Sequence, residues 1–138
     1  MFLGGTMAEG WACYATDLMD EIGFLTPDES LAQQHTRARL LARAVVDLGL
    51  HRGTMTFDDA IAIYRDRVGM SQAAAAGEVC KNSMFPATAI MYWLGTESLH
   101  RLRRARAQRE GAVFSLRRFH DRVLSFGAIP VALLEGIW

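Results

Sequence analysis

The chain has 138 residues, and its 15 Lys and Arg balance its 15 Asp and Glu, so the formal net charge is zero. This length fits one domain with a substantial core. The balanced charge offers no electrostatic footprint for nucleic acid and no polybasic attraction to a membrane surface. No apolar stretch approaches the roughly 18 residues of a membrane span, and Met1–Trp11 lacks a signal-peptide pattern. We therefore expect a cytoplasmic protein without nucleic-acid or membrane partners.

Capping signals predict where the first long helices begin. Thr26–Glu29 combines an N-cap threonine, a first-turn proline and a capping-box acid, and predicts a helix that runs to about Leu50. Thr56 opens the next predicted helix, which has two aspartates in its first turn and should end near Gly69.

The second half of the chain is predicted to be helical as well. Helices are expected over Ser71–Met84, from Pro86 to at least Leu102, and over Ser115–Phe126, with a possible terminal turn at Pro130–Leu134. No stretch alternates with period two for long enough to form a strand. The sequence therefore predicts one all-α domain over residues 1–138, with five or six packed helices and short connections.

Glu9 places one carboxylate at the start of the otherwise apolar stretch Gly10–Ala15. One interpretation is that it interacts with first-turn amides of its own helix, where negative charge is stabilising. The other is that it binds a metal ion. None of the four histidines stands in a His-Glu-x-x-His pattern, and the two cysteines form no CxxC pair, so the sequence holds no complete zinc site.

His51 is the histidine with the most suggestive context. It follows Asp47 by four residues at a predicted helix C-terminus, where the helix dipole and the carboxylate both favour a charged or oriented imidazole. A C-terminal histidine cap explains the pattern equally well. His120 is expected to pack or to form a hydrogen bond in the last helix, whereas His35 and His100 are expected at the surface. The arginine-rich run from His100 lacks interleaved aromatics and indicates a solvated helix end.

Several stretches resemble successive landmarks of a bacterial family known as domain of unknown function 885 (DUF885). These stretches are Glu9–Ala15, Val46–His51, Pro86–Gly95, Phe119–Leu124 and Gly127–Pro130. They occur in the family's order and cover nearly the whole chain. The resemblance implies a large, mostly helical protein similar to gluzincin zinc metallopeptidases, in which a His-Glu motif supplies ligands and the general base.

The family's His-Glu motif lies upstream of the Glu9 landmark, so the resemblance implies that this chain is the C-terminal part of such a peptidase. Glu9 then matches the downstream metal ligand, and zinc is expected only if the missing N-terminal part is present. The implied substrate is a peptide or another amide. The implied partner is the N-terminal part of the same protein, and self-association is also expected.

The resemblance extends to further site residues. His51 matches a family histidine placed near the substrate or the developing oxyanion, and Tyr92 is a candidate hydrogen-bond donor. Lys81 and Asn82 stand where the family has an Arg-Tyr pair, which makes them substrate-binding candidates with altered chemistry. Gly95 is expected to allow close helix packing. The resemblance thus implies an enzyme segment that is inactive alone. The alternative is a free-standing helical interaction module or a degenerate remnant without catalysis.

Overall fold

The computed structural model describes residues 4–137, and this part of the chain contains helices and no strand. The helices are α1 (Gly5–Glu21), α2 (Pro27–His51), α3 (Phe57–Val68), α4 (Gln72–Met84), α5 (Ile90–Glu110), the short 3₁₀ turn η1 (Gly111–Val113), α6 (Leu116–Ser125) and α7 (Val131–Ile137). The all-α prediction is confirmed. The described residues form seven α-helices because the expected terminal turn is a short helix.

The predicted helix starts at Thr26 and Thr56 are confirmed in detail. Each threonine is an N-cap whose hydroxyl accepts a hydrogen bond from the amide of the third helical residue, Glu29 or Asp59. The carboxylate of that residue in turn accepts a hydrogen bond from the N-cap amide. Both helices therefore begin with a complete capping box, which satisfies amides that the helix itself leaves unpaired.

The predicted helix start at Pro86 is wrong. α5 begins at Ile90, and its N-cap Ala89 forms no cap with its own side chain. The preceding residues form a turn in which Ala87 adopts a φ of 63°, a left-handed conformation that is uncommon for a residue with a side chain. A proline is compatible with a first helical turn, but Pro86 lies in the turn that follows the end of α4.

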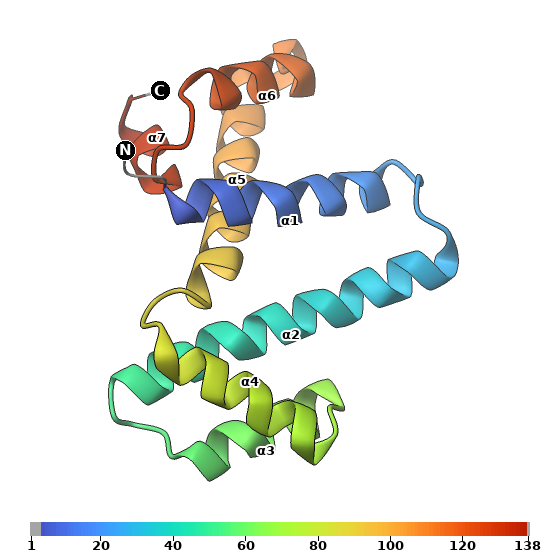
Figure 1. The fold of residues 1–138 in the computed structure, drawn as a ribbon. Coiled ribbons are helices and arrows are strands. Elements are labelled where there is room, and N and C mark those ends of the chain that lie inside the picture. The colour runs from blue at the N-terminus through green and yellow to red at the C-terminus, as the bar shows by residue number, and fades with distance from the viewer. Residues whose placement is uncertain (1–3, 138) are drawn as a thin grey trace.

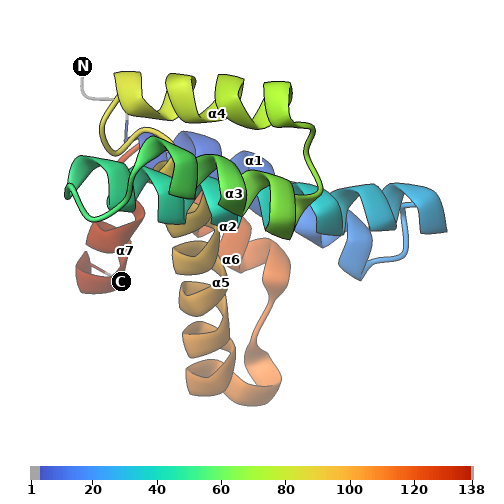
Figure 2. The same ribbon diagram turned by 90° about the horizontal axis from the view of Figure 1, so that it is seen from below.

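The helices form two groups joined by α5 and by the turn between α1 and α2 (Figure 1). α1 crosses α5, and this is the most extensive helix contact in the described chain. On one side of the crossing, α2 packs on α3 and α4, and on the other side lie α6 and α7, as the view from below also shows (Figure 2). The start of α1 is tied to this second side, because the Gly4 amide donates to the Ala128 carbonyl at 2.7 Å.

Each group of helices has its own hydrophobic core. The first core draws its buried residues from α1, α5, α6 and α7: Met7, Tyr14, Leu18, Leu99, Leu102, Phe119, Val123, Val131 and Leu134. The second draws on α2, α3 and α4: Ala42, Val46, Ala60, Tyr64, Val68, Ala75 and Val79. The predicted site residues on α2 and on the first turn of α5 therefore lie where the two groups meet.

Candidate functional site

Glu9 does not lie in the first turn of its helix. α1 begins at Gly5 and has no acid in its first turn, so the interpretation of Glu9 as a helix-terminal charge is wrong. The residue is half-buried in the second turn, and its carboxylate faces Tyr92 on α5. Two predicted site residues from distant parts of the sequence are thus neighbours.

The phenol of Tyr92 sits between a carboxylate and a guanidinium. Burial is the largest effect that raises the pKa of Tyr92, and the charge of Glu9 together with a hydrogen bond to its carboxylate raises that pKa further. The guanidinium carbon of Arg43 lies 5.2 Å from the centre of the Tyr92 ring. The same arginine forms an ion pair with Glu78 of α4 at 3.4 Å. α1 and α2 therefore supply charged groups beside the Tyr92 side chain, and α4 holds the arginine through Glu78.

His51 is held by the carboxylate that precedes it by one turn. Its Nδ1 lies 2.9 Å from the carbonyl oxygen of Asp47 and 2.8 Å from Oδ1 of the same residue. The hydrogen bond that the ring donates to the backbone carbonyl of Asp47 is the main effect that raises the pKa of His51, and the carboxylate adds to it against the opposing effect of desolvation. The predicted interaction between the two residues is confirmed, whereas the role of His51 toward a substrate stays a prediction.

The two substrate-binding candidates on α4 point in different directions. Asn82 is only 2% exposed, and its amide donates a short hydrogen bond to the Tyr64 hydroxyl inside the second core. Lys81, the preceding residue, is exposed. Asn82 therefore has a hydrogen-bond partner inside the protein. The prediction that these two side chains bind a substrate rests on the resemblance alone.

A zinc ion does not fit the described residues by themselves. Within residues 4–137, no three His, Cys, Asp or Glu side chains gather closely enough to hold a metal. Protein zinc sites use three or four protein ligands. Glu9 can supply one carboxylate oxygen, and the remaining ligands would have to come from another segment.

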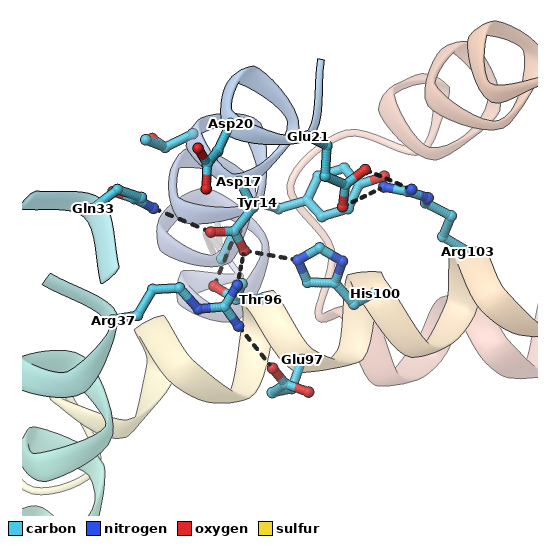
Figure 3. Close-up of polar contacts among 12 residues, drawn as sticks. Tyr14, Asp17, Asp20, Glu21, Gln33, Arg37, Thr96, Glu97, His100 and Arg103 are labelled. Carbon is cyan, nitrogen blue, oxygen red and sulfur yellow. Dashed lines mark hydrogen bonds and ion pairs between the residues drawn. The ribbon is translucent and has the colours of Figure 1, made fainter. Parts of the chain in front are cut away.

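A second polar cluster, centred on Asp17 of α1, is a feature that the sequence analysis missed. The Asp17 carboxylate accepts hydrogen bonds from His100 at 2.7 Å, from Arg37 at 2.9 Å and from Gln33 at 3.1 Å (Figure 3). Arg37 also reaches Glu97 at 3.4 Å. The expectation that His100 lies exposed is wrong, because its side chain is only 12% exposed. The residues come from three helices, so no local spacing could have revealed the cluster.

Burial alone would raise the pKa of Asp17, but its hydrogen bonds and the charge of Arg37 outweigh burial and lower it. The carboxylate is therefore charged at neutral pH and holds α1, α2 and α5 together. Beside it lies a cavity of about 170 Å³ whose wall includes Cys13, Leu40, Trp93 and Thr96. Burial is the main effect that raises the pKa of the Cys13 thiol, so this thiol is a weak nucleophile.

His120 satisfies the expectation of a hydrogen-bonded histidine. Its Nε2 lies 2.9 Å from the Tyr14 hydroxyl, and its ring meets that of Trp11 edge-on. Burial and the nearby charge of Arg103 lower the pKa of His120, which keeps the imidazole neutral over most of the physiological range. This contact belongs to the first core and fixes α6 against α1.

A model of a known protein family matches nearly the whole chain. The model of a family described as "Bacterial protein of unknown function (DUF885)" matches residues 1–137. No curated protein matches the chain. No helix of the described residues is both long enough and apolar enough to cross a membrane.

Two solved structures are similar to the whole fold, and each is described as a "putative lipoprotein". The one from Shewanella oneidensis, described as of unknown function, has 29% identity and a TM-score of 0.88 over 96% of this chain. The one from Colwellia psychrerythraea has 32% identity and a TM-score of 0.88 over 94% of this chain. The chain covers only 25% and 23% of those two proteins, so it spans about a quarter of their length.

Proposed function

Because the chain belongs to the DUF885 family of bacterial proteins, we propose that it forms the C-terminal segment of a zinc-dependent, peptidase-like hydrolase. The segment contributes one metal ligand, Glu9, and part of a substrate site, and it is inactive alone. The observation that carries this proposal is the contact between Glu9 and Tyr92, which places a carboxylate and a phenol donor side by side at the meeting of α1 and α5.

The contact supports a ligand role because it orients the carboxylate. A phenol beside the carboxylate of Glu9 can donate to one oxygen and leave the other for a cation, and such outer hydrogen bonds are typical of ligating carboxylates. A zinc ion held by Glu9 and by ligands of another segment would polarise an amide carbonyl and activate a water molecule. The missing ligands agree with the chain's coverage of about a quarter of its solved relatives.

The remaining candidates have roles that follow from their exposure. His51 keeps 25% of its side chain accessible, and in its protonated form it is proposed as the donor toward a peptide or other amide substrate. Lys81 is exposed and can offer a single positive charge, which grips a carboxylate less specifically than an arginine fork. Asn82 contributes by fixing Tyr64, and through it α3 and α4, rather than by direct contact.

Zinc content tests the proposal directly. The chain alone, and the chain mixed with the N-terminal part of one of the two solved relatives, are purified by size exclusion and analysed for metal. We expect stoichiometric zinc only in the mixture, lost in Glu9→Gln and retained in Glu97→Gln, a half-buried control carboxylate that pairs with Arg37. A stable mixed complex without zinc, or one whose zinc survives Glu9→Gln, would contradict the proposal.

An interaction module without catalysis is the second candidate. It is favoured by an apolar stripe on α2, where Leu41, Val45 and Leu48 are 43 to 48% exposed although they recur at helical spacing. Exposed apolar area of this kind favours self-association or a helical partner. A chain that sediments as a monomer at micromolar concentration would count against self-association.

A cytoplasmic location is proposed from the sequence alone. The names of the two solved relatives point to a different class of location, and fractionation of the producing cells separates the two. We expect the chain in the soluble cytoplasmic fraction, and recovery with the membranes as a lipid-modified protein would contradict this.

A further inference from the structure

Asp47 is the most deeply buried carboxylate on α2, and its side chain reaches away from its own helix. It is only 1% exposed. Oδ2 accepts hydrogen bonds from the amides of Ala89 at 2.8 Å and Ile90 at 3.1 Å, and Oδ1 accepts one from the amide of Ala87 at 3.0 Å. Ile90 is the first residue of α5 and Ala89 is its N-cap, whereas Ala87 lies in the preceding turn. The carboxylate therefore caps a helix that has no side-chain cap of its own and also holds the turn before it.

The same carboxylate binds the imidazole of His51. Nδ1 of His51 faces two acceptors, the Asp47 carbonyl and Oδ1, at 2.9 and 2.8 Å. Two acceptors leave Nδ1 one role, that of a donor, so a neutral His51 carries its proton on Nδ1 and its lone pair on Nε2. Asp47 is thus a single point that fixes the tautomer of His51 and the first turn of α5, which carries Tyr92.

We propose that Asp47 is the positioning residue of the site: through one buried carboxylate it sets His51 at the end of α2 and Tyr92 at the start of α5 in a fixed mutual arrangement. This inference rests on the proposed function for its catalytic meaning. A side-chain cap from another helix ties two elements together, whereas a local cap such as that of Thr26 fixes only its own helix.

The groups around His51 are few. Asp47 is the charged group that contacts its ring, and the Ser83 carbonyl at the end of α4 is the other group that raises the pKa of His51. Both are acceptors, and both favour a proton on the ring. Loss of the Asp47 charge should therefore lower the pKa of His51, which simple loosening of α5 would not do.

Nitrogen-15 NMR of the full chain, labelled at histidine and at the backbone, tests the proposal. In the unmodified chain we expect neutral His51 in the Nδ1–H tautomer. In Asp47→Asn the side-chain oxygen remains with the Ala89 and Ile90 amides, and the NH₂ group faces Nδ1 and the Ala87 amide, which loses its acceptor. We therefore expect the Nε2–H tautomer and a lower His51 pKa. Amide exchange at Ala89 and Ile90 should accelerate about tenfold or more, as loss of a charge-assisted hydrogen bond implies.

Asp59→Asn is the matched control, because Asp59 is also an acid at a helix start but its carboxylate binds only Thr56 of its own capping box. This variant should leave the His51 signals unchanged. An Nε2–H tautomer in the unmodified chain would overturn the proposal without any variant. Faster exchange at Ala89 and Ile90 with an unchanged His51 would also overturn it, since Asp47 would then be a helix cap only. None of these measurements needs zinc or a substrate. A failure of this inference can therefore be told apart from a failure of the proposed function.

Discussion

Gly10 of α1 and Gly95 of α5 lie backbone against backbone where the two helices cross. A Cβ atom on Gly95 would stand 2.8 Å from the Cα of Gly10 and closer still to the carbonyl oxygen of Thr6. Real Cβ atoms do not approach backbone atoms so closely, so the crossing requires both glycines. The predicted role of Gly95 in close helix packing is thereby confirmed, and it accounts for the position of Glu9 one residue before Gly10.

Gly95→Ala should destabilise the protein because the added methyl group forces α1 and α5 apart. We expect the free energy of unfolding to fall by about 1 to 3 kcal/mol, the usual cost of overpacking. Urea denaturation followed by circular dichroism measures it. The matched control is Gly77→Ala in α4, where a Cβ meets open space and a gain of about 0.4 to 1 kcal/mol is expected. Equal effects of the two substitutions would contradict the close approach.

Asp17→Asn should weaken the junction of α1, α2 and α5. The amide keeps the shape of the carboxylate but loses its charge-assisted hydrogen bonds to Arg37 and His100. We expect a loss of roughly 1 to 3 kcal/mol in the free energy of unfolding. Asp20→Asn is the control, because that carboxylate accepts one hydrogen bond, from Gln34 at 3.2 Å, and should change stability little.

The lowered pKa of Asp17 also predicts a pH dependence. A carboxylate whose pKa is lower in the folded state contributes stability that is fully present above its unfolded pKa of about 3.9. This contribution is lost as the pH falls through the folded pKa. The difference in stability between the unmodified chain and Asp17→Asn should therefore shrink below about pH 4, as acid unfolding curves of the two would reveal. A constant difference down to pH 2 would argue against a charged Asp17.

Tyr64 should ionise only in strong base. Burial raises the pKa of this phenol to about 12, against a smaller lowering by the hydrogen bond from Asn82. Spectrophotometric titration of tyrosinate, compared with Tyr64→Phe, isolates its contribution. Because the folded state holds the Tyr64 proton more tightly than the unfolded state, stability should decrease as the pH rises above about 10. A titration of all tyrosines near their unperturbed pKa would contradict the burial of this hydroxyl.

Ala87→Gly should leave the protein equally stable or make it more stable. Ala87 has a φ of 63°, and glycine adopts this conformation without the steric cost of a Cβ. We expect a change between zero and about 1 kcal/mol in favour of the variant, measured as the thermal midpoint. Ala105→Gly, at an exposed position inside α5, should instead cost about 0.8 to 1 kcal/mol. Destabilisation by both substitutions would contradict the left-handed turn.

Local signals predicted the helix starts that depend on neighbouring residues. The capping boxes at Thr26 and Thr56 need only a threonine and an acid three residues later, so their chemistry is written within one turn of sequence. The start of α5 was predicted wrongly for the opposite reason, since the carboxylate that caps it belongs to Asp47, 42 residues before Ala89. A proline at position 86 was the best local candidate, and the cap that decides the start comes from another helix.

The contacts of the candidate site likewise divide into those that local sequence predicts and those that depend on the tertiary fold. The pairing of Asp47 with His51 was predictable because four residues separate them on one helix. The contact of Glu9 with Tyr92 and the cluster around Asp17 join helices that only the tertiary fold brings together. The resemblance pointed to Glu9 and Tyr92 as site residues, but nothing in the sequence indicated that they touch.

The second hydrophobic core has a consequence for the order of folding. Its buried residues come from one continuous stretch, whereas the first core joins α1 to helices at the far end of the chain. Contacts between residues close in sequence form faster than contacts that close long loops. The three central helices can therefore assemble early and shorten the loop that α1 and α5 must close. In an emerging polypeptide, this central unit would be complete before α5 is available to cross α1.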